Sequence, residues 1–148
     1  MDERDRQHLL SLLGHAQAAI GYARAHGHGW WKNPETLDAV LMRLSQVGEA
    51  ASKTSPTALA EIPGIIWRDV KGIRAKIVHD YQTVDVEVIR GVVSRQLPRL
   101  ITTVREALAA EQKPATGGRP TPSSPSGSKS SAGAAPQGST RPARRPPA

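Results

Sequence analysis

The chain has 148 residues and no cysteine, which suits one compact domain plus an extension and excludes disulfides and thiolate metal sites. The formal net charge is +7, but five of the positive charges lie in residues 114–148, where there are no acids. Residues 1–113 therefore carry only +2. The basic charge alone is a poor argument for a nucleic-acid-binding fold.

No stretch of the sequence resembles a membrane anchor or a secretory signal. Residues 1–6 are mostly charged. No apolar run approaches the roughly 20 residues that a membrane-spanning helix needs. We therefore expect a cytoplasmic protein with no membrane partner.

The composition changes sharply after Lys113. Residues 114–148 consist mainly of Pro, Ser, Gly, Ala and Thr with hardly an aliphatic side chain, so they cannot form a core. We expect a helical domain over residues 1–113 and a disordered tail over residues 114–148. The tail either adds electrostatic affinity for phosphate groups or, as a simpler interpretation, is a solubilising extension.

Helical periodicity runs through the residues before the tail. Apolar residues at steps of three and four predict a first helix over about residues 5–25. The sequence Asn33-Pro34-Glu35 combines a capping side chain, a proline at the first helical position and an acid, so it predicts a second helix that ends near residue 53. Ser55-Pro56 predicts a short helical turn that ends by residue 64.

Two more helical stretches follow. The third helix is expected to fade near residue 82, and the residues that set its core face are Ile66, Val70, Ile73 and Ile77. The last stripe runs from residue 86 to residue 108 and contains Pro98, which predicts a break or kink. With no period-two pattern, the fold class is all-α, an antiparallel bundle of four to five helices. Small bundles often complete their burial by dimerising.

The candidate chemistry lies in residues 67–81. With the core face given above, His79 faces away from the core, as do Gly72 and Lys76. An imidazole that titrates near neutrality, a permanent cation at Arg74 and the phenol of Tyr81 would suit a phosphodiester substrate. Helix phase alone favours the simpler interpretation that His79 is only a solvated surface residue.

The order Arg74, four residues, His79, one residue, Tyr81 resembles the motif of the HepT-like toxins in the HEPN ribonuclease superfamily. The resemblance covers most of residues 5–108 and includes Val47-Gly48-Glu49-Ala50, Trp67-Arg68-Asp69, Val84-Asp85 and Leu97-Pro98-Arg99-Leu100. Two positions depart from the family pattern. Ile66 stands where proline is common, and Ala75 stands where a polar residue, often asparagine, is common.

The resemblance implies a HEPN-like fold and a toxin that is a metal-independent endoribonuclease, with no cofactor. The ribose 2′-hydroxyl of the RNA substrate would attack the adjacent phosphate, with His79 as general acid or base and Arg74 as the phosphate clamp. Lys71, Lys76 and Asp80 would support the cleft. Glu49 would orient Arg74 or Lys71, or else be an exposed helix charge.

The resemblance also implies partners. Positions 74 and 79 of a straight helix lie about 140° apart, which a homodimer with facing motifs accommodates. Tyr81 would receive AMP from a nucleotidyltransferase antitoxin of the MntA type, a bulky anion that would block RNA entry. The alternative for Tyr81 is a half-buried ring that closes the bundle.

Two other functions and two other motifs remain open. The chain could be a non-catalytic helical module that binds a nucleotide or a nucleotidyltransferase, or could itself be the antitoxin of another pair. His26-Gly27-His28 lacks a third ligand, which argues against a metal site. Trp30-Trp31 could stack bases, but a packing anchor at the turn between the first two helices is the favoured interpretation.

Overall fold

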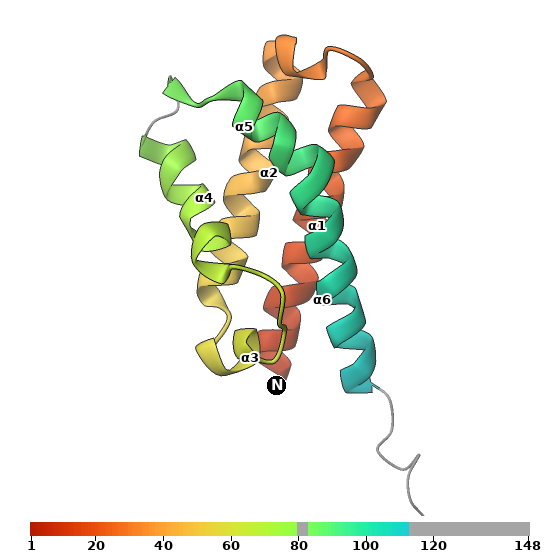
Figure 1. Ribbon diagram of the computed structural model, residues 1–148, viewed down its shortest axis with the longest axis vertical. Helices are drawn as coiled ribbons and strands as arrows, with labels where there is room; N and C mark the ends of the chain where they lie inside the picture. The colour runs from red at the N-terminus through yellow and green to blue at the C-terminus, as the bar shows by residue number, and fades with distance from the viewer. Residues whose placement is uncertain (80–82, 113–148) are drawn as a thin grey trace, which may run out of the picture. The chain divides into compact units, whose positions relative to one another are not determined.

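The computed structural model describes residues 1–79 and 83–112, and the side chains of residues 1–77 and 83–112. The tail predicted over residues 114–148 lies outside the described residues. In chain order the helices are α1 (Glu3–His26), α2 (Pro34–Lys53), α3 (Pro56–Ala60), α4 (Trp67–His79), α5 (Val86–Gly91) and α6 (Leu97–Gln112), with a 3₁₀ segment at Trp30–Lys32 and a π-helical segment at Val92–Gln96. The long helices alternate in direction (Figure 1), which confirms the all-α antiparallel bundle. None of these helices is long and apolar enough to cross a lipid bilayer.

Side-chain caps fix the helix starts that the sequence predicted. Asn33 Oδ1 accepts a hydrogen bond from Thr36 N at 2.9 Å, and Pro34 occupies the first turn of α2. Ser55 Oγ accepts from Ala58 N at 3.2 Å and caps α3. Each cap satisfies a backbone N–H that the helix itself leaves without a partner. The second helix and the short turn are therefore confirmed.

The core is formed mainly where α1 packs against α2, with α4 packed on α2 and α6 on α1. Its largest fully buried side chains are Leu9, Leu12, Leu44, Ile62, Leu97, Val40, Val47 and Val104. They are aliphatic and come from four different segments, so burial of apolar surface is the main force that assembles the unit.

The predicted core face of the third helix was wrong at one end. Ile66 precedes α4, and 65% of its surface is exposed. Ile77 is buried, whereas Val70 and Ile73 are only partly buried. Trp67 instead fixes the start of α4, because its indole N–H donates to the carbonyl oxygens of Leu59 at 3.1 Å and Ile62 at 3.4 Å.

The irregularity expected near Pro98 takes the form of a wider helical turn rather than a break. Leu97 N donates to Val92 O, five residues earlier, which is the hydrogen bond of a π-helix. Pro98 has no N–H, so the normal pattern cannot continue through it. The chain accommodates the proline by widening the preceding turn, and α6 continues directly from it.

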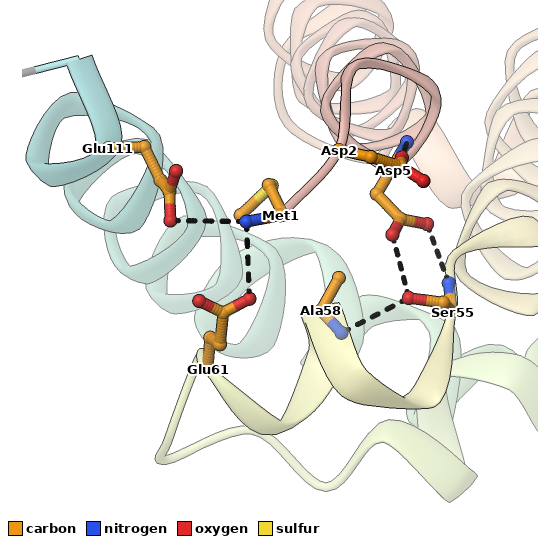
Figure 2. A network of polar contacts seen from close by, with 7 residues as sticks. All are labelled: Met1, Asp2, Asp5, Ser55, Ala58, Glu61 and Glu111. Carbon is orange, nitrogen blue, oxygen red and sulfur yellow. Dashed lines mark hydrogen bonds and ion pairs between the residues drawn. The ribbon is translucent and has the colours of Figure 1, made fainter.

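A polar network joins α1 to α3 (Figure 2). Asp5 is buried, and its two carboxylate oxygens accept from Ser55 N and Ser55 Oγ, each at 2.7 Å. The Met1 amine lies 3.4 Å from Glu111 Oε1 and 3.5 Å from Glu61 Oε1. The hydrogen bonds from the Ser55 side chain and backbone hold the pKa of Asp5 below its usual value.

Replacing Ser55 by alanine removes both the α3 cap and a hydrogen bond to Asp5. We expect Ser55→Ala to lower the free energy of unfolding by about 1 kcal/mol through the cap alone. The depressed pKa means that Asp5 stabilises the fold above its unfolded pKa of roughly 3.9, and that this contribution is lost as the pH falls through the folded pKa. As the pH falls through that range, Ser55→Ala should therefore lose less free energy of unfolding than the wild type does. Urea denaturation at several pH values measures both effects, and Ser52→Ala, on the exposed face of α2, is the matched control.

Candidate active site

Helix α4 lies alongside α2 (Figure 1), and Gly48 sets how closely they approach. A Cβ added at Gly48 would lie 3.0 Å from Arg74 N and 3.1 Å from both Arg74 Cβ and Val70 O. Two of these atoms belong to the backbone of α4, so no side-chain rotation could relieve the contact. Any side chain at position 48 would therefore require the backbone of α4 to move.

Glu49, the next residue, holds Arg74 in place. Arg74 Nε lies 3.0 Å from Glu49 Oε2, and Lys53 Nζ lies 3.6 Å from Glu49 Oε1. The side chain of Arg74 remains 52% exposed, so solvent reaches the guanidinium. An exposed ion pair adds little stability, but it limits the positions that the guanidinium can take. The contact expected between Glu49 and Arg74 is present, while the catalytic roles of both stay predictions.

The other candidate residues are distributed along α4 or lie beyond it. Lys71 is half-buried and Lys76 is exposed. Position 79 is the last residue of α4, about 140° around the helix axis from position 74. The side chain of His79 and all of Asp80 and Tyr81 lie outside the described residues.

A groove of about 840 Å³ is lined by α4, α5, the π-helical segment and the start of α6. Isoleucines and valines from α4, α5 and the π-helical segment form much of its lining, together with Asp69 and Lys76. At its edges Ile66 is 65% exposed and Val88 is 52% exposed. Arg74 is not among the residues that line it. The Glu49–Arg74 pair therefore lies outside the groove.

The two tryptophans at the turn after α1 differ in burial and in their contacts. Trp30 is buried and packs in the core, as expected for an anchor. Trp31 is only half-buried, and Arg90 of α5 lies over its ring, with Cζ 3.5 Å from the ring centroid. Arg90 was not predicted as a functional residue, because its contact with Trp31 joins residues far apart in the chain.

The family model described as ribonuclease HepT-like matches residues 15–107, a segment that includes Gly48, Glu49, Arg74 and His79. The match covers well over half of the chain. The chain belongs to the ribonuclease HepT-like family. No solved structure matches it.

Three curated relatives carry similar names. The chain is 37% identical over 67 residues to "Probable ribonuclease HepT" of Thermococcus cleftensis, which is 45% of this chain and 60% of that protein. It is 26% identical over 77 residues to "Putative RNase" of Methanocaldococcus jannaschii, 52% of this chain and 64% of the relative. A protein of the same name from Caldanaerobacter subterraneus subsp. tengcongensis is 26% identical over 81 residues, 55% of this chain and 72% of the relative. The chain thus spans less than two thirds of the length of two of these relatives.

A methyl group at Gly48 should push α4 away from α2. We expect Gly48→Ala to lower the free energy of unfolding by about 1–3 kcal/mol, because the added atom meets backbone rather than a flexible side chain. Gly14→Ala is the matched control, since no atom lies within 4 Å of its Cβ position in α1, and it should stabilise the chain by up to about 1 kcal/mol. Urea denaturation compares the two variants. Equal stabilisation by both would show that the close approach at Gly48 is not required.

Proposed function

We propose that the chain is an endoribonuclease toxin that cleaves RNA without a metal ion and acts in the cytoplasm. The observation that carries the proposal is the ion pair between Arg74 and Glu49. Arg74 lies on α4, which ends at His79, and all three residues lie in the segment that the family model matches. Relatives whose printed names are ribonucleases support the same activity. A cation that binds the phosphate and an imidazole that exchanges protons are groups that suit metal-independent cleavage of a phosphodiester.

The proposed reaction uses the nucleophile that RNA itself carries. His79 accepts the proton of the ribose 2′-hydroxyl, whose oxygen attacks the adjacent phosphorus. The bond to the 5′-oxygen of the next nucleotide breaks, and that oxygen takes a proton, which leaves a 2′,3′-cyclic phosphate and a 5′-hydroxyl. Arg74 binds the phosphate and stabilises the negative charge that grows on its oxygens. Glu49 acts as a positioning residue through Arg74, with Lys71, Lys76 and Asp80 as further charges near the motif.

A homodimer is part of the proposal. Positions 74 and 79 lie about 140° apart on α4, so one chain does not readily present both to a single phosphate. The groove beside α4, with Ile66 and Val88 exposed at its edges, offers apolar surface that a second copy could cover. Arg74 of one chain would then complete the site of the other.

We further propose control by a nucleotidyltransferase antitoxin that transfers AMP to Tyr81. The added phosphate would lie within reach of the motif cations and would exclude RNA by charge and bulk. Intact-mass analysis of the chain co-produced with its nucleotidyltransferase, with Tyr81→Phe as control, distinguishes this role from a ring that only closes the bundle. The alternative, a non-catalytic partner-binding module, requires no RNA cleavage.

Replacing His79 should abolish the activity. We expect induction of the wild-type chain to arrest growth and fragment cellular RNA, and His79→Ala to reduce cleavage about 10²- to 10⁴-fold while the protein stays folded. His26→Ala, at an exposed histidine in α1, is the matched control and should behave as wild type. Growth curves, RNA gels and analysis of the RNA ends measure the outcome. If wild type and both variants leave RNA intact, the non-catalytic module becomes the better account.

A further inference from the structure

A second cleft, of about 480 Å³, lies where the turn between α1 and α2 meets α5 and the π-helical segment. Its aromatic wall comes from Trp30 and Trp31, whose rings meet edge to face at 5.9 Å between centroids. The guanidinium of Arg90 lies 3.5 Å from the centroid of Trp31, and Arg90 Nη1 also bonds to Glu87 Oε1 at 2.8 Å. The ring and the carboxylate together hold the cation over the aromatic face.

Arg95 brings a second cation to the same cleft. A Cβ built at Gly91 would lie 2.8 Å from Arg95 Nη2, so the guanidinium rests against the helix surface that the glycine leaves uncovered. Arg95 is exposed, and no carboxylate of the part of the chain that the structure describes forms an ion pair with it. It lies in the π-helical segment, a distortion often found at functional sites.

We propose that this cleft binds single-stranded RNA, with an unpaired base stacked on the Trp31–Arg90 pair and a neighbouring phosphate bound by Arg95. Aromatic rings and guanidinium planes are the surfaces on which unpaired bases stack, and a cation without an acidic partner suits a phosphate. The alternative is that the contact between Trp31 and Arg90 only fastens α5 to the turn. That alternative does not account for Arg95, which lies over Gly91 in the same cleft.

The elements that line the cleft lie near the end of the bundle where α4 ends. Figure 1 shows the turn between α1 and α2, the C-terminal end of α4 and the start of α5 at one end of the bundle. The inference rests on the proposed function for its choice of RNA, but it concerns binding and not cleavage. It assigns Trp31, Arg90 and Arg95 to substrate recognition, separate from the motif around Arg74.

The test measures binding of a fluorescent single-stranded 2′-O-methyl oligonucleotide to the full chain by anisotropy. The probe lacks a free 2′-hydroxyl, so it cannot be cleaved, and binding is scored independently of ribonuclease activity. We expect Arg95→Gln to weaken binding roughly fivefold at about 0.1 M salt. Arg105→Gln removes the same charge from exposed α6, about 15 Å further along the helix, and should change binding less than twofold. Trp31→Ala should weaken binding about tenfold.

Two further variants separate a local site from bulk charge. Gly91→Ala adds a methyl group where the Arg95 guanidinium rests, so it should displace Arg95, weaken binding and leave the fold intact. Glu87→Gln removes a negative charge from the cleft and should tighten binding about twofold to fivefold, whereas Glu106→Gln in α6 should have little effect.

Each result supports or overturns the proposal. Equal effects of Arg95→Gln and Arg105→Gln would assign binding to overall charge and overturn it. Loss of complex formation with the nucleotidyltransferase, without a change in probe binding, would make the cleft a protein-docking site instead. If the wild-type chain cleaves no RNA but these contrasts hold, the cleft stands as a nucleic-acid site and only the ribonuclease proposal fails. If the chain cleaves RNA and the contrasts vanish, only the cleft proposal fails.

Discussion

The contact between α2 and α4 at Gly48 is the constraint on which the candidate site depends. Because Gly48 has no side chain, the backbone of α4 approaches until Arg74 lies beside Glu49, and their ion pair follows from that approach. Trp67 fixes the start of the same helix through hydrogen bonds to carbonyl oxygens before it. Helix α4 is thus held at its start and along its middle. Position 79 is the last residue of the same helix, so its backbone position follows from these two contacts.

Helix α4 also borders the groove that we propose a second copy covers. The helix packs on α2 and also borders a groove, where Ile66 and Val88 are exposed. A monomer would leave this apolar surface in water, which costs free energy that a second copy would recover. The same geometry separates positions 74 and 79 around the helix.

The fold was predictable where local chemistry decides it. Asn33-Pro34 and Ser55-Pro56 carry their own caps, so the second helix and the short turn start where the sequence placed them. The Arg74–His79 spacing and Gly48-Glu49 were visible as a family pattern. Helix phase misled at Ile66, because the indole of Trp67 and not an aliphatic stripe fixes the start of α4. The Trp31–Arg90 and Asp5–Ser55 contacts join residues far apart in the chain, and neither has a local signature.

The most direct test of the account is a mixing experiment with two inactive full-length chains, Arg74→Ala and His79→Ala, incubated with RNA in the presence of a metal chelator. If Arg74 of one chain and His79 of another share a site, each mixed dimer contains one complete site. Cleavage should then return to about a quarter of the wild-type level, although neither variant cleaves alone. No recovery from two folded variants that exchange subunits would contradict the shared site, and full cleavage by either variant alone would contradict its assigned role.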